Sequence, residues 1–91
     1  MTTTQQRVTV AHESGLHARP ASKFVQTASE FDSRIDVGRP SEEERADAKS
    51  SIAVISLGVD SGEEIEITAE GSDSVAAIER LVALVENDFD L

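Results

Sequence analysis

The sequence predicts an α+β fold in which a four-stranded antiparallel sheet is covered on one face by three helices. Two observations predict this fold. The expected elements follow one another as β-α-β-β-α-β-α along the 91 residues, and the expected strands each have one apolar face, which suits an antiparallel sheet with helices on one side. No repeat or linker divides so short a chain, so we expect a single domain over residues 1–91.

The first strand and the first helix are predicted from two different periodicities. From Gln6 to Ala11 apolar and polar residues alternate, which is typical of a strand with one buried face. After a turn at Ser14 and Gly15, the apolar residues adopt helical spacing, namely Ala21, Phe24, Val25 and Ala28. Pro20 precedes this pattern, and proline is tolerated in the first turn of a helix. The helix should therefore begin close to His17.

The middle of the chain predicts two strands and a short helix. Residues 33–37 alternate again, and after a break and an acidic, exposed turn at residues 42–44 a short strand could follow at residues 45–48. Residues 50–57 then form a short helix, with Ser50 as its N-cap and Gly58 as its C-terminal stop.

The last strand and the last helix have the clearest patterns. Residues 64–69 alternate strictly between acidic or hydroxyl side chains and apolar ones. After Gly71, either Ser72 or Asp73 is expected to cap the final helix. The apolar stripe predicted for that helix is Val75, Ile78, Leu81, Val82 and Val85.

Composition and charge exclude several classes of function. Eighteen acidic residues against eight basic ones give a net charge of −10, which repels nucleic acid and anionic lipid, so we expect neither as a partner. With no cysteine and two histidines, disulfides and the usual zinc sites are not expected, and no metal or cofactor is predicted. The start of the chain lacks a signal-peptide pattern, and no apolar run reaches the ~20 residues of a membrane span, so we expect a cytoplasmic protein.

The most informative segment is the turn between the first strand and the first helix. It places His17 directly before a helix N-terminus, where free amide groups and the positive end of the helix dipole form a natural phosphate site. Arg19 adds a permanent planar cation that can reach phosphoryl oxygens. Gly15 permits the tight turn that leaves the imidazole accessible. His12 lacks this context and is interpreted as a surface residue.

This arrangement predicts a phosphoryl carrier. The positive surroundings favour a neutral imidazole that acts as a nucleophile. After transfer, the same dipole and Arg19 stabilise a phosphoryl group of about two negative charges. The segment has no nucleotide-binding glycine loop and no paired general acid and base, so we expect a carrier with a phosphohistidine intermediate and no enzyme activity of its own.

Three blocks of sequence resemble the HPr family, the phosphocarriers of the bacterial phosphoenolpyruvate:sugar phosphotransferase system. Residues 15–21 (GLHARPA) are similar to its active-site signature. Residues 48–58 (AKSSIAVISLG) are similar to its regulatory-serine segment, and residues 62–71 (GEEIEITAEG) to its last strand and turn. The match runs from about Val8 to Val85 in order and with compatible spacing.

The resemblance implies an open-faced β-sandwich of four antiparallel strands and three helices. It also implies that enzyme I, loaded from phosphoenolpyruvate, phosphorylates His17 at Nδ1, and that the phosphoryl group passes to an enzyme IIA domain for sugar uptake. Ser14, Ala18 and Arg19 correspond to positions around the phosphoryl group. Ser50 corresponds to the serine that a kinase phosphorylates in some lineages, although helix capping alone explains a serine there.

Two departures from the family pattern concern the partners. Residues 38–45 are longer and more acidic than the usual turn, and Ser51 stands where the family has a large apolar residue in its docking patch. Ile52 remains as the expected partner surface, while Phe24 is assigned to the core. We expect a monomer that works with enzyme I and with specialised acceptors.

Two alternatives to sugar transport stay open at this point. The same chemistry could serve the phosphotransfer subunit of a dihydroxyacetone kinase, and the sequence does not separate this acceptor from enzyme IIA. The chain could also be a regulatory binding module that acts through the Ser50 face. An exposed nucleophile at His17 beside Arg19 argues against that second role.

The acidity itself leads to a prediction about salt. An excess of acidic residues is typical of proteins from a salt-rich cytoplasm. It is equally typical of surface charge that keeps an ordinary protein soluble. If the acidic runs, such as residues 42–44 and 86–90, repel one another, the melting temperature should rise steeply with potassium chloride. The reason is that the screening length falls from about 30 Å at ~0.01 M salt to about 3 Å at ~1 M. A thermal melt across this range measures the effect, and a flat melting temperature would leave the acidity as solubility charge.

Overall fold

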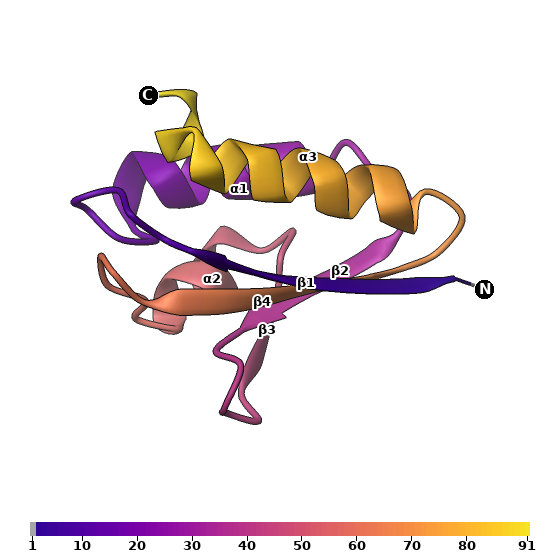
Figure 1. The fold of residues 1–91 in the computed structure, drawn as a ribbon, viewed down its shortest axis with the longest axis horizontal. Coiled ribbons are helices and arrows are strands. Elements are labelled where there is room, and N and C mark those ends of the chain that lie inside the picture. The colour runs from indigo at the N-terminus through magenta and orange to yellow at the C-terminus, as the bar shows by residue number, and fades with distance from the viewer. Residues whose placement is uncertain (1) are drawn as a thin grey trace.

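The computed structural model describes residues 2–91, and its elements follow the predicted order (Figure 1). The strands are β1 (Thr3–Thr9), β2 (Arg34–Gly38), β3 (Arg45–Asp47) and β4 (Glu64–Glu70). The helices are α1 (Ala18–Ala28), α2 (Ser51–Ser56) and α3 (Ser74–Glu86), followed by a short 3₁₀ turn, η1 (Asp88–Asp90). The strands form one antiparallel sheet in the order β1-β4-β2-β3, which confirms the predicted fold class.

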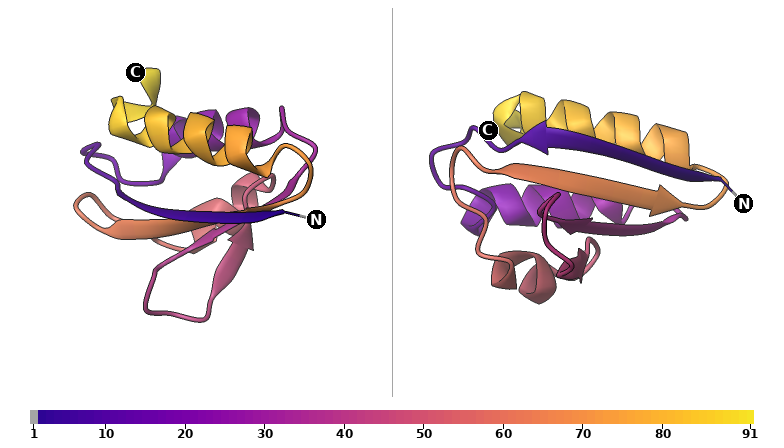
Figure 2. Two further views of the ribbon diagram at one scale, coloured as in Figure 1. Left: turned by 45° about the vertical axis from the view of Figure 1, so that its right-hand side comes forward. Right: turned by 60° about the horizontal axis from the view of Figure 1, so that its bottom comes forward.

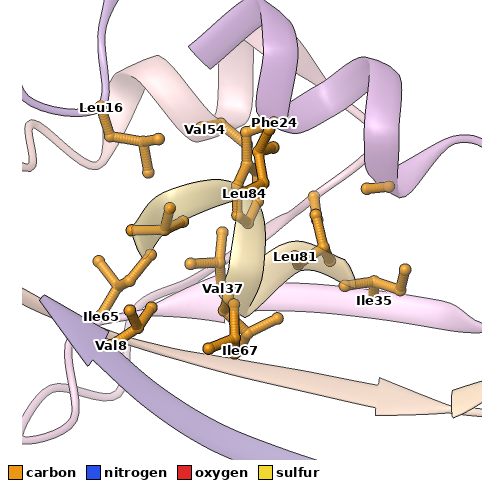
Figure 3. Close-up of a cluster of buried hydrophobic side chains, with 14 of the residues drawn as sticks. Val8, Leu16, Phe24, Ile35, Val37, Val54, Ile65, Ile67, Leu81 and Leu84 are labelled. Carbon is orange, nitrogen blue, oxygen red and sulfur yellow. The ribbon is translucent and has the colours of Figure 1, made fainter. Parts of the chain in front are cut away.

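The helices and the sheet enclose the core between two layers. Helices α1 and α3 lie side by side over one face of the sheet, and α2 packs against α1 near β3 (Figures 1 and 2). Phe24 of α1, Leu81 of α3 and Ile67 of β4 are fully buried there (Figure 3). Phe24 is therefore a core residue, as the sequence predicts.

Strand β1 lies further toward the N-terminus than its alternation indicates. It runs from Thr3 to Thr9, where residues 6–11 were expected, and its side chains are mostly exposed as far as Arg7. These polar residues extend the strand because their backbone continues the ladder with β4, from the Thr9–Glu64 pair to the Thr3–Glu70 pair. Pairing with β4 thus sets the position of β1, and the alternation of apolar residues does not indicate where this pairing begins or ends.

The apolar stripe predicted for α3 is wrong at Val75. Val75 is 54% exposed, whereas the other four predicted residues are buried. The buried face begins instead at Ser74, whose hydroxyl lies 3.0 Å from the hydroxyl of Thr4 in β1. A helix that turns Ser74 toward the sheet directs the next residue, Val75, away from it.

Asp73 occupies the N-cap position of α3, but its carboxylate binds a different segment. It accepts hydrogen bonds from the backbone amides of Asp32 (2.8 Å) and Ser33 (2.9 Å) and from the hydroxyl of Ser33. It makes no capping hydrogen bond to α3. The Ser33 hydroxyl, followed by the Asp32 amide, holds the pKa of Asp73 below its ordinary value. Asp73 therefore ties the loop before β2 to the start of α3.

Candidate functional site

His17 is the N-cap residue of α1, as the sequence predicts. Its backbone is extended (φ −133°, ψ 167°) and its side chain is 34% exposed. The next residue, Ala18, has a φ of +50°, which a residue with a side chain rarely adopts. Within residues 2–91, the amides of Ala18 and Arg19 have no hydrogen bond to a loop or cap carbonyl. These two amides are the free donors of the helix N-terminus.

The loop that carries His17 is fixed by contact with the loop before β4. Gly15 has a φ of +68°, and a Cβ atom there would lie 2.5 Å from the carbonyl oxygen of Val59. The adjacent Leu16 is fully buried and its amide donates to the same oxygen at 2.9 Å. Only glycine fits this close approach and this backbone conformation, so Gly15 joins the two loops as well as forming a turn.

This contact brings Asp60 to the imidazole. Oδ1 of Asp60 lies 3.8 Å from Nε2 of His17, and the Asp60 side chain is 83% exposed. Sequence reasoning treated residues 60–62 as a turn and missed Asp60 as a site residue. An Asp-Ser-Gly turn gives no signal that its aspartate faces a histidine far away in the sequence.

The predicted phosphate-binding residues come together in one pocket. Ser14, Ala18 and Arg19 line a shallow pocket of about 240 Å³ beside the first turn of α1. Its remaining walls are His12, Pro20 and Leu91. His17, which precedes Ala18 in the sequence, is not one of the lining residues. A small pocket with a hydroxyl group, a guanidinium group and free amides nearby can hold a phosphoryl-sized anion.

His12 lies at the surface, as interpreted from the sequence, but it also makes contacts that the sequence did not predict. Its ring is half-buried, and Nδ1 accepts a hydrogen bond from the amide of Ser14 at 3.1 Å. The ring also packs edge-on against Phe89, with centroids 6.1 Å apart. Phe89 is fully buried in η1, where Asp88, Phe89 and Asp90 all have positive φ. The acidic tail thus folds back and supports the wall of the pocket.

Helix α2 presents the residues that were predicted to contact partners or a kinase. Ser50 is its N-cap, and the Ser50 hydroxyl accepts a hydrogen bond from the Ala53 amide at 3.3 Å. Ile52 is 79% exposed, and Ile55, which sequence reasoning did not single out, is 43% exposed. The two isoleucines lie three residues apart on the helix and so face in similar directions.

The acidic turn between β2 and β3 contains an arginine, Arg39, whose contacts the sequence did not predict. Residues 42–44 are exposed, as predicted. Arg39, however, reaches the segment before β4, where it donates to the carbonyls of Leu57 (2.8 Å) and Gly58 (2.9 Å) and to both carboxylate oxygens of Glu63 (2.8 and 3.0 Å). The hydrogen bonds from Arg39, followed by the Asp60 amide, lower the pKa of Glu63 to about 2.

In the part of the chain that the structure describes, no group of three or more histidine, cysteine, aspartate or glutamate side chains is placed to hold a metal ion. Across the same residues, no helix has the length and apolar character needed to cross a membrane.

Comparison with known proteins identifies the family. The family described as the PTS HPr component phosphorylation site matches residues 4–87. The phosphocarrier protein HPr of Haloferax volcanii is 48% identical over 77 residues, which cover 85% of this chain and 86% of that protein.

Solved structures agree with this match. A crystal structure of HPr-C-His from Thermoanaerobacter tengcongensis has a TM-score of 0.91 and 41% identity, with 97% of each chain covered. Another, described as an HPr dimer from the same organism, has a TM-score of 0.74 and 48% identity, with 82% of this chain and 84% of that one covered. The chain therefore belongs to the HPr family, the phosphocarrier proteins of the phosphotransferase system.

Proposed function

We propose that this chain accepts a phosphoryl group on His17 from enzyme I and passes it to an enzyme IIA domain that serves sugar uptake and phosphorylation. The observation that carries the proposal is the position of His17 at the N-cap of α1, next to the free amides of Ala18 and Arg19. Family membership supports the same chemistry. In this proposal residues 1–91 act as one domain, as a cytoplasmic monomer.

The proposed transfer uses the Nδ1 lone pair of His17. This nitrogen attacks phosphorus while the bond between phosphorus and the donor group breaks, and the electron pair of that bond leaves with the donor. The phosphoryl oxygens then accept hydrogen bonds from the two free amides and from Arg19, which lines the same pocket as Ser14 and Ala18. In the onward transfer an acceptor group attacks phosphorus, the bond between phosphorus and Nδ1 breaks, and its electron pair returns to the imidazole.

Helix α2 supplies the proposed docking surface. Exposed Ile52 and Ile55 offer apolar contact area to enzyme I and to the acceptor. The neighbouring Ser51 is small, so this surface depends more on Ile55 than the sequence alone indicates. Ser50 remains a regulatory candidate at the edge of the surface, while its capping hydrogen bond accounts for the serine structurally.

His17 should be the residue labelled by radioactive phosphoenolpyruvate and a cognate enzyme I. His17→Ala should abolish label that is acid-labile and base-stable, because the other imidazole uses its Nδ1 to accept the Ser14 amide. His12→Ala should reach the same final labelling as the parent. Labelled protein supplied to an enzyme IIA domain, or to the phosphotransfer subunit of a dihydroxyacetone kinase, would identify the acceptor. Full labelling of His17→Ala would contradict the proposal.

Arg19→Ala should slow phosphotransfer without unfolding the domain, since Arg19 is exposed and its proposed role is electrostatic. A charge-assisted hydrogen bond is worth ~1.5–3 kcal/mol, and its full loss in the transition state corresponds to a rate roughly ten- to a hundredfold lower. Rapid-quench labelling compares the two proteins at one salt concentration, and thermal melts check that both are folded. Equal rates would remove Arg19 from the mechanism.

A further inference from the structure

The loop before β4 places a carboxylate beside the imidazole that the proposed function phosphorylates. From the contact between Asp60 and His17 we propose that Asp60 is a positioning residue for phosphotransfer. Its carboxylate keeps the imidazole proton on Nε2, so that the lone pair of Nδ1 is free to take the phosphoryl group. This inference rests on the proposed function and adds to it a residue that acts through His17.

Asp60 lies beside Nε2 of the His17 ring. Its Oδ1 lies 3.8 Å from Nε2 of His17, and among residues 2–91 it is the one carboxylate within 4.0 Å of that imidazole. The loops that carry the two residues lie together at one end of the molecule, at the left of Figure 1. The 3.8 Å distance is that of an ion pair and not of a hydrogen bond, and the Asp60 side chain, which is 83% exposed, has room to rotate toward Nε2.

A carboxylate at Nε2 has a direct chemical consequence. A neutral imidazole carries its proton on one nitrogen and a lone pair on the other, and a hydrogen-bond acceptor at one nitrogen favours the proton there. When Nδ1 forms its bond to phosphorus, the ring keeps the Nε2 proton and gains positive charge, which the carboxylate balances. When the phosphorus–nitrogen bond breaks again, its electron pair returns to Nδ1 and the ring becomes neutral. No proton has to be gained or lost in either direction.

A hydrogen-bond network that begins at Arg39, in the turn between β2 and β3, holds Asp60 at this position. Its amide donates to Glu63 at 2.7 Å, and its carbonyl accepts from the Glu63 amide at 3.1 Å. Arg39 in turn holds the Glu63 carboxylate and the carbonyls of Leu57 and Gly58. The pKa of Glu63 is lowered to about 2, so its carboxylate stays ionised well below neutral pH. Arg39 and Glu63 therefore hold the backbone of Asp60 in place. Through Arg39, the turn between β2 and β3 contributes to the site.

The tautomer of His17 can be measured directly on unphosphorylated, ¹⁵N-labelled protein. At about pH 9, where an ordinary imidazole is neutral, two-bond ¹⁵N–¹H spectra distinguish the nitrogen that carries the proton from the one that does not. The parent should hold the proton mainly on Nε2. Asp60→Ala should increase the population with the proton on Nδ1, and Asp60→Asn should have a smaller effect because its amide oxygen still accepts a hydrogen bond. Asp32→Asn is the charge-matched control, since Asp32 is also exposed but follows the other end of α1.

The same variants should change the rate of labelling by enzyme I. Asp60→Ala should lower it about two- to fivefold, the range expected for an exposed charge pair, while Asp32→Asn should match the parent. Glu63→Gln should reproduce part of the loss, and the double variant Asp60→Ala/Glu63→Gln should be no slower than Asp60→Ala, because Glu63 acts through Asp60. Melting temperatures check that each variant is folded.

The outcomes separate this inference from the proposed function. An unchanged tautomer in Asp60→Ala, or an unchanged labelling rate, would overturn the role of Asp60. A parent protein that is not labelled on His17 would instead overturn the proposed function, and the spectra of the unphosphorylated protein would still decide whether Asp60 directs the His17 proton. A tautomer shift accompanied by slower labelling is the result that we expect.

Discussion

The contact between Gly15 and the carbonyl of Val59 holds two loops together that are far apart in the sequence, and the site depends on it. The antiparallel pairing of β1 with β4 ends at Thr9 and Glu64. The loop that follows β1 and the loop that precedes β4 therefore meet at the same end of these two strands. There the buried Leu16 donates its amide to the Val59 oxygen. Every element of the site, from the start of α1 to Asp60, is positioned from this junction.

The sequence predicts those parts of the site that are encoded locally. His17 could be placed at a helix start because a glycine turn, an early proline and apolar residues at helical spacing all lie within a few residues of it. The contacts of Asp60 and Arg39 could not be predicted, because each joins segments whose proximity depends on strand pairing. The same reason explains the displaced start of β1 and the exposed Val75, where Ser74 faces Thr4 instead. The contact of His12 with Phe89 could not be predicted, because Phe89 lies in a tail whose sequence is typical of an exposed charged run.

The proposed phosphoryl site of this protein, whose net charge is −10, relies on contacts at short range. Two free amides, the guanidinium of Arg19 and the dipole of α1 supply local positive potential, and each acts within the first turn of the helix. At physiological salt the screening length is about 8 Å, so distant acidic residues contribute little there. The nearest acidic group, Asp60, faces Nε2, whereas the resemblance assigns the phosphoryl group to Nδ1. In the proposed mechanism, the negative charge of Asp60 is thus accommodated on the side of the ring that does not react.

The candidate site depends most on the junction at Gly15, and hydrogen exchange of the Leu16 amide tests this dependence most directly. In Gly15→Ala the new Cβ would lie 2.5 Å from the Val59 oxygen, whereas Gly58→Ala, at a similar φ of +65°, meets nothing within 4 Å. The two variants therefore place alanine at a similar positive φ and differ in the clash. We predict that the Leu16 amide exchanges much faster in Gly15→Ala than in the parent or in Gly58→Ala, and that amides in the middle of α3 change little. Equal protection of Leu16 in all three proteins would contradict the claim that this contact holds the site.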